Sequence, residues 1–546
     1  MSHRCRCHSP CVLIAVSLLG VISLCLTALC RAQDSEPQAK PRPQNVRPVF
    51  IPKITISKET TWATEPIGPS GFIDYLSVTN RHYSQGVTPE NNAVVMLYQA
   101  TGPAPDHHLQ PDKFFQLLGI KPPPNEGDYF ETVGEWRKRT GKVVPEAGFP
   151  ALQNLAETAL TRPWTAKEFP EIAEWLHSIE IPLRRITEGT ERTEYYSPYV
   201  SSEEGEGKMF FVTLPGIQVG RAIARALVSR AMLSLGENER LQAWSDLQAV
   251  HRLGRLMGRG PSTVEGFTGF IIETMAIDGE LRFLSETRPT AKFIARYLKQ
   301  LQNLPPRSLM ADKMDHIERA TFLDCCQHMA RGQLTIAEFS EMPNFWHENP
   351  EQTWADKLLE QALIRLVDWD EILKSGNRWY DRCVSAAQLP TYRQRTGALK
   401  NLDQEIQQLR VQTQRLDRLS ILVDKSKATR YYADTLVSIF LSGVVHRMGG
   451  ENVVRQRFQN LELAFALAAW RSEHDSYPAN LAELAPQYIP AISDDLFNNQ
   501  PLHYQQTASG YRLYSVGKNE KDDLGLAYGD GKDDLIIQMP FVKPAH

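Results

Sequence analysis

Apolar residues recur at helical spacing through the middle of the chain. From about residue 217 they return every three or four positions, which places them on one face of an α-helix. Polar, glycine-containing breaks at 236–238 and 258–261 interrupt this pattern. The pattern therefore predicts three consecutive helices. Their apolar positions are Ile223, Leu227 and Ala231, then Leu241, Trp244 and Leu247, and then Phe267, Phe270, Ile271 and Met275.

Helices joined by such short breaks lie antiparallel beside each other. Further helical patterns at about 310–331, 352–375, 400–424 and 426–447 extend the arrangement. The segment 231–257 looks like one tetratricopeptide-type unit, but the period of about 34 residues does not recur three times. We therefore predict a mainly α fold whose body, at 207–450, is an irregular antiparallel helical domain. Helix-pair repeat character is the alternative.

The pattern changes near residue 450. The segment 458–470 carries a broad apolar helical face, and two later runs, 502–506 and 511–516, alternate as strands do. The polar residues between these runs indicate a hairpin, and 535–539 is a candidate third strand. This predicts a small α+β domain at 451–546, in which a short antiparallel sheet packs on the helix.

The amino terminus has the pattern of an export signal. Arg4 and Arg6 precede an apolar run at 11–30, and Cys30 and Ala32 are small residues of the kind that a signal peptidase reads. The run is also close to the roughly 20 residues that span a bilayer, so an uncleaved signal anchor is the alternative. We expect an exported protein of the periplasm or cell surface that contacts the membrane only through this segment, if it is retained. The predicted boundaries are 1–32 for the signal peptide or signal anchor, 33–58 for a Pro-rich tether, and 59–206 for a mixed, mostly helical region with long loops.

Charge and length narrow the class of protein. Without residues 1–32, which carry Arg4, Arg6, Arg31 and no acid, 57 basic and 64 acidic side chains remain. A mildly acidic balance argues against a nucleic-acid partner. A mature chain of about five hundred residues predicts about two to four domains.

Cysteine use indicates no disulfide framework. Five of the eight cysteines lie within 1–32, which leaves Cys325, Cys326 and Cys383 for the body of the protein. In an oxidising compartment one bridge could join Cys383 to one of the adjacent pair. Three small buried residues are the alternative.

An acidic segment follows the second predicted strand. Its candidate cation ligands are Asp522, Asp523, Asp530, Asp533 and Asp534. Carboxylates on a flexible, glycine-bearing loop are the hard oxygen ligands that calcium takes, although the spacing is not that of an EF-hand. A solvated turn-rich loop is the alternative.

The order of motifs in the last ninety residues points to a family. The motifs are the Tyr477-Pro478 turn, Leu481 and Leu484, Asp495 and Phe497, Pro501 and Tyr504, the strand from Tyr511 to Gly517, and the aspartates after it. This order resembles the globular domain of type II secretion major pseudopilins, over roughly residues 455–540. The resemblance implies a calcium ion held by the five aspartates and backbone oxygens. The whole chain also looks like large, uncharacterised bacterial exported proteins that end in the same module.

The chain departs from pseudopilins in several places. Leu496 stands where proline is expected, and Asn499 stands where glycine is usual, although asparagine tolerates a left-handed turn. No hydrophobic filament helix directly precedes the module. We therefore expect a borrowed fold and not a filament subunit.

A second candidate site lies on the helix near residue 320. Asp312, His316, Asp324 and His328 follow each other at four- or eight-residue separations, so two Asp–His pairs share one stripe. Such side chains could ligate a metal, but exposed i,i+4 pairs are the simpler interpretation. The sequence holds no Walker loop, Gly-x-Ser-x-Gly elbow or dinucleotide fingerprint.

Three functions remain open at this point. The first is a non-enzymatic cell-envelope protein that binds an unknown protein partner and whose C-terminal domain is stabilised by calcium. The second is an accessory component of a type II secretion-like system. The third is a metal-dependent hydrolase that uses the Asp–His stripe. They are ranked in that order.

Overall fold

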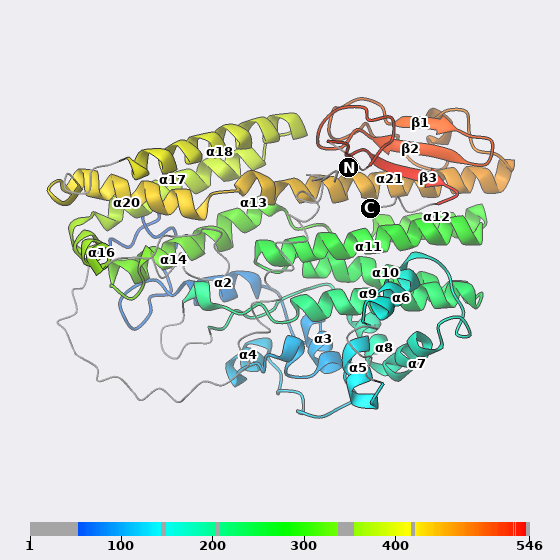
Figure 1. The fold of residues 1–546 in the computed structure, drawn as a ribbon, viewed down its shortest axis with the longest axis horizontal. Coiled ribbons are helices and arrows are strands. Elements are labelled where there is room, and N and C mark those ends of the chain that lie inside the picture. The colour runs from blue at the N-terminus through cyan, green and yellow to red at the C-terminus, as the bar shows by residue number, and fades with distance from the viewer. Residues whose placement is uncertain are drawn as a thin grey trace, which may run out of the picture.

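The computed structural model describes residues 53–142, 149–201, 208–336, 354–415, 421–527, 529 and 531–541. These residues form a mainly helical protein with a small three-stranded sheet near the C-terminus (Figure 1). The predicted signal segment and most of the predicted tether lie outside the described residues. Among the helices within them, none is long and apolar enough to cross a bilayer.

The first part of the fold consists of short helices joined by irregular segments, as predicted. Side-chain caps fix several of their starts: Asp74 and Asn92 accept backbone N–H groups, and Thr132 forms a capping box with Glu135. The helices are α2 (Tyr75–Tyr83), α3 (Ala93–Thr101), α4 (Asp112–Leu118), α5 (Val133–Thr140), α6 (Phe149–Thr161), α7 (Pro170–Ser178) and α8 (Glu180–Gly189), with single turns η1 (Pro105–His107) and η3 (Met209–Phe211).

The three consecutive helices predicted in the middle of the chain are confirmed. They are α9 (Ile217–Gly236), α10 (Arg240–Met257) and α11 (Thr263–Thr287), and α12 (Ala291–Gln302) follows. Helices α10 and α11 cross closely because Gly254, Gly258 and Gly269 lie at the contact. A Cβ on Gly269 would stand 2.6 Å from the Gly254 carbonyl oxygen.

The next helices form a second core. The predicted helix at 310–331 is present, but a π-helical turn interrupts it. The prediction for 352–375 is wrong because Asp368 caps a new helix there, and the one for 400–424 starts too late. These helices are α13 (Met310–Lys313), the π turn η4 (Met314–Glu318), α14 (Arg319–Ala330), α16 (Trp354–Leu366), α17 (Trp369–Ala387), α18 (Tyr392–Gln414) and α20 (Lys425–Phe440).

The long helix α21 (Val444–His474) joins the body of the protein to the sheet. The sheet lies along one side of α21, and α11 and α12 lie along the other (Figure 1). Leu461, Phe465 and Leu467 are completely buried, and one continuous core runs from Ala100 in α3 to Phe541. The helix therefore packs on the sheet, as predicted, and also on the helical body. The boundary predicted at 451 falls inside it.

The predicted hairpin and third strand are confirmed. Strands β1 (His503–Gln506), β2 (Tyr511–Ser515) and β3 (Leu535–Met539) form an antiparallel sheet in the order β1-β2-β3. Leu513 in the central strand pairs with Tyr504 on one side and with Ile537 on the other. The short turn η5 (Leu481–Leu484) connects α21 to this sheet.

Polar groups also hold the segment before the sheet against strand β2. Asp495 is buried and accepts hydrogen bonds from the backbone of Phe497 and Val516 and from the Ser515 hydroxyl. Asn499 has φ 55°, the left-handed conformation that the sequence anticipates for it. The Arg282 guanidinium donates to the Phe541 carbonyl, so the segment that follows β3 docks on α11.

Candidate functional site

The acidic loop connects β2 to β3. The structure brings Asp523, Asp533 and Asp534 together through shared backbone and side-chain contacts, whereas Asp530 lies outside the described residues. Asp522 is exposed and points toward the strands, where its Oδ1 accepts from the Tyr514 hydroxyl at 3.2 Å. Among the described aspartates of the loop, Asp523, Asp533 and Asp534 therefore form an inner group, and Asp522 lies outside it.

Asp534 is the most buried of these carboxylates, with 1% of the residue exposed. Its Oδ2 accepts from the backbone N–H of Gly525 at 2.7 Å and of Asp523 at 3.1 Å. Its Oδ1 is buried and has no hydrogen-bond partner among the described residues. A buried carboxylate oxygen without a donor is costly, so this atom is the place where a cation would fit.

The other inner carboxylates hold the loop in shape. Asp533 accepts from the backbone of Lys518 and Asn519, and Asp523 accepts from the Asn519 amide and the Asp533 backbone. Gly517 has φ 68°, and a side chain there would collide with the Asp533 carbonyl.

Electrostatics in the loop favours a cation. Burial raises the pKa of Asp534 and of Asp533, and the nearby charge of Asp523 raises both further. Bound calcium would compensate this repulsion and accept oxygen ligands in irregular geometry. Within the described ranges, which omit Asp530, no group of three or more His, Cys, Asp or Glu side chains is arranged to hold a metal.

The Asp–His stripe is divided in the structure. The π turn at 314–318 contains His316, so it shifts the helical register of Asp312 relative to Asp324 and His328. His316 stacks on His82 with ring centroids 4.1 Å apart and meets the edge of Trp62, while Asp312 is exposed.

The second pair of the stripe is not exposed, which corrects the simpler sequence interpretation for these two residues. Asp324 and His328 are each 4% exposed. Asp324 accepts from the Met209 backbone N–H at 2.8 Å, and burial raises the pKa of this carboxyl to about 7. The His328 imidazole lies 2.8 Å from the Gln333 side-chain oxygen. Both side chains are thus engaged in local contacts that tie loops to α14.

The three cysteines of the body are buried, and Cys325 and Cys326 are free thiols. No bridge from Cys383 to either of them is formed, so the alternative of small buried residues is correct. Burial raises the pKa of both the Cys325 and the Cys326 thiol, which makes them poor nucleophiles.

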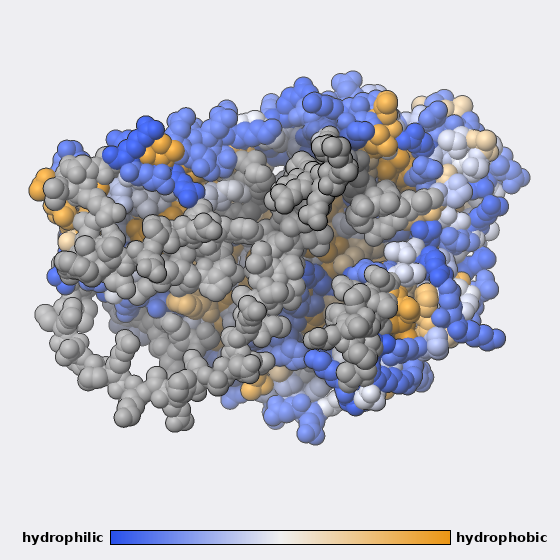
Figure 2. Space-filling model, in the orientation of Figure 1, coloured by the Kyte–Doolittle hydropathy of each residue, from blue (hydrophilic) through white to orange (hydrophobic). Residues whose placement is uncertain are grey.

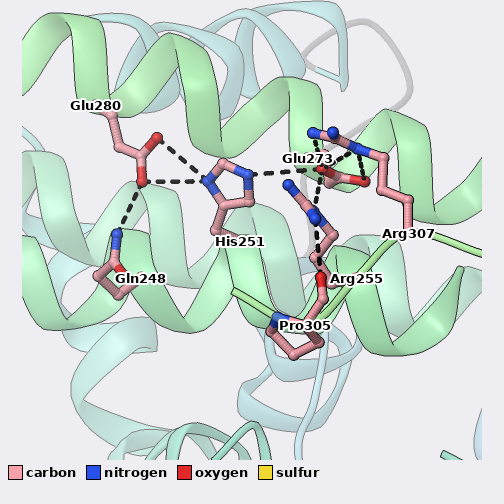
Figure 3. A network of polar contacts seen from close by, with 7 residues as sticks. All are labelled: Gln248, His251, Arg255, Glu273, Glu280, Pro305 and Arg307. Atoms are coloured by element: carbon pink, nitrogen blue, oxygen red, sulfur yellow. Dashed lines mark hydrogen bonds and ion pairs between the residues drawn. The ribbon is translucent and has the colours of Figure 1, made fainter. Parts of the chain in front are cut away.

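A buried polar network in the helical body was not predicted from the sequence (Figure 3). His251 on α10 lies between Glu280 and Glu273 of α11, with Nδ1 3.2 Å from Glu280 Oε2 and Nε2 3.6 Å from Glu273 Oε2. His251 and Glu280 are completely buried, and Glu273 is 1% exposed. The Gln248 amide donates to Glu280 at 3.1 Å.

Two arginines complete the network on the side of Glu273. Arg255 Nε donates to its carboxylate at 2.6 Å, and Arg307 donates from Nε and Nη2. Both guanidinium groups stand within 4.9 Å of the ring centroid of Phe458, and the His251 ring meets the same phenyl group edge-on. Because Phe458 belongs to α21, the network joins three helices and the loop before α13.

The protonation states follow from these contacts. Burial alone would raise the pKa of Glu273, but the neighbouring His251, Arg307 and Arg255 outweigh it and lower the pKa to about 2. Burial would lower the pKa of His251, yet Glu280 and Glu273 together raise it. The network is therefore a set of compensated buried charges.

The sequence indicates this network only when two consecutive helices are compared. His251 and Arg255 are four residues apart, and Glu273 and Glu280 are seven residues apart, so each pair shares one helical face. Taken singly, each pair resembles an exposed charged face. A buried network differs from an exposed charged face in that two adjacent helices carry charges of opposite sign.

Comparisons with known proteins add no assignment: no family model, no curated protein and no solved structure matches this chain.

Proposed function

We propose that this protein is a non-enzymatic, exported cell-envelope protein whose helical body binds a protein partner and whose C-terminal sheet is stabilised by calcium at the acidic loop. The observation that carries the calcium assignment is the buried Oδ1 of Asp534, which has no donor among the described residues. Asp523 and Asp533 lie beside it, and burial and mutual repulsion raise the pKa of the two most enclosed carboxyls.

A binding role for the helical body is supported by the burial of its imidazole and thiol groups, which are paired or enclosed inside the fold. The His251 imidazole is enclosed by ion pairs, and Cys325 and Cys326 are buried. On the face drawn in Figure 2, the coloured surface is mostly hydrophilic, with apolar residues in small separate areas. Such a surface suits a transient partner, because a non-obligate interface as a whole is about as apolar as the rest of the protein surface.

Calcium is expected to bind the purified protein and to stabilise the sheet. At a concentration about 100 times the Kd, a single site would add about 2.7 kcal/mol to the free energy of unfolding. Asp534→Asn should abolish this binding, because the amide removes the charge and one oxygen. Calorimetric titration measures the binding, and thermal unfolding with and without calcium measures the stabilisation.

Asp494→Asn is the matched control, since it removes the same charge from an exposed aspartate near the sheet. It should bind calcium as the unaltered protein does. Equal loss of binding in both variants, or equal binding of magnesium and calcium by the unaltered protein, would contradict a specific calcium site at Asp534. Metal analysis of the protein as isolated gives an independent check.

A further inference from the structure

The acidic loop also contacts the second helical core, through the first turn of α18. The Tyr392 hydroxyl donates to the Lys518 carbonyl at 3.3 Å, and Arg393 donates from Nε and Nη2 to the Glu520 carboxylate at 2.9 and 2.6 Å. Farther along, α18 packs into the second core, whereas the sheet belongs to the first. The loop therefore joins two parts of the protein that have separate cores.

A small third core lies beside these polar contacts. It consists of the buried residues Tyr392, Phe497 and Val516, and the Tyr392 and Phe497 rings meet edge-on with centroids 4.7 Å apart. Val516 comes shortly before the loop, and Leu535, which directly follows Asp534, packs against the same core. Both ends of the acidic loop and the start of α18 thus share one apolar cluster.

The inner carboxylates fix the part of the loop that α18 contacts. Asp533 accepts from the backbone N–H groups of Lys518 and Asn519 at 3.0 and 3.2 Å, and the Asn519 amide donates to Asp523 at 2.8 Å. Residues 518–534 include six acids and three lysines, so one calcium ion would change their net charge from −3 to −1. Without it, repulsion between the carboxylates loosens the turn on which the contacts of α18 depend.

We propose that calcium at the acidic loop controls the mobility of α18, by holding the loop in the shape that receives the first turn of this helix. The proposal rests on the calcium site of the proposed function and adds what that site regulates. The polar contacts alone cannot hold the helix, because Arg393 is 69% exposed and such ion pairs contribute little. The coupling is reciprocal, so docked α18 also tightens calcium binding.

Hydrogen exchange of the full chain, with and without saturating calcium, tests this coupling. Calcium should slow exchange about fivefold or more at amides in the first two turns of α18, because these turns open only when the contact with the loop opens. The last turn of the same helix, at 410–414, should not change. Asp534→Asn, which removes a calcium ligand, should abolish the effect.

Tyr392→Ala tests the coupling from the side of the helix. It removes the ring from the small third core without changing the charge of the loop, and should weaken calcium binding about fivefold in calorimetric titration. Tyr431→Ala is the control, since it removes a partly buried tyrosine of the second core. Tyr431 belongs to α20, which lies at the opposite end of the molecule from the sheet (Figure 1), so calcium affinity should not change.

The outcomes separate this proposal from the calcium site itself. Calcium binding without slower exchange at the start of α18 would overturn the coupling and leave the site standing, whereas no calcium binding would overturn both. Equal calcium affinity of Tyr392→Ala and the unaltered protein would also overturn the coupling. If Tyr392→Ala fails to fold, Arg393→Gln decides by exchange: the effect of calcium on α18 should shrink, and an unchanged effect would contradict the proposal.

Discussion

Glu273→Gln is expected to lower the free energy of unfolding by about 3–5 kcal/mol, because it leaves buried charges without a counterion. The substitution keeps the size of the side chain but removes the carboxylate on which Arg255, Arg307 and His251 converge. Arg255 is 6% exposed and cannot turn its guanidinium to water without opening the contact with Phe458. Urea unfolding followed by tryptophan fluorescence measures the change, with the slope of the transition as a check on cooperativity.

Glu405→Gln provides the matched control. Glu405 also pairs with an arginine through both oxygens, to Arg382, but the two side chains are 48% and 45% exposed. An exposed pair contributes about 0–1 kcal/mol. Replacing Glu273, Arg255 and Arg307 together by methionine should recover much of the loss, because the two arginines are then no longer left without a counterion and His251 keeps its pairing with Glu280. A loss at Glu273 no larger than at Glu405 would show that water reaches the network.

Gly269→Ala is expected to destabilise the protein by about 1–3 kcal/mol, although glycine to alanine normally strengthens a helix. The added Cβ would lie 2.6 Å from the Gly254 carbonyl oxygen and 2.7 Å from the Gly258 Cα. These neighbours are backbone atoms, so the helices must separate. Separation of α10 from α11 would also lengthen the ion pairs of His251. Thermal and urea unfolding measure the loss.

Gly397→Ala in α18 is the corresponding control. This glycine is exposed and helical, and a Cβ there meets nothing within 4 Å. The variant should gain about 0.5–1 kcal/mol from helix propensity alone. If Gly269→Ala were stabilised by the same amount, the close crossing of α10 and α11 would not be required for stability.

The regular parts of the fold were predictable because local pattern determines them. The glycine-containing breaks at 236–238 and 258–261 separate three helices as expected, and strand β3 has the predicted bounds. The start of α18 was missed because Thr391 caps that helix through Gln394, a signal that depends on two residues and not on apolar spacing. The π turn at 314–318 has no sequence signature of its own, and two of its residues, Met314 and Ile317, are buried in the second core.

The candidate sites also differ in how far the sequence could predict them. The aspartates of the loop are close in sequence, so their proximity could be expected, and the structure places Asp523, Asp533 and Asp534 together. The His251 network depends on which faces of α10 and α11 meet, and the contact of Asp324 with the Met209 backbone joins residues 115 positions apart. Neither pairing can be read from a single segment, because long-range contacts are set by the topology of the whole chain.

The shared helix α21 also bears on how the chain can fold as it is made. Ribosomes release the N-terminal residues first, yet the core around α11 and α12 is completed only by Leu461, Phe465 and finally Phe541. Until those last residues emerge, the faces of α11 and α12 that α21 covers have no partner. Nascent chains should therefore keep these faces open until residues 461–541 have emerged, which leaves them in a state that chaperones can hold.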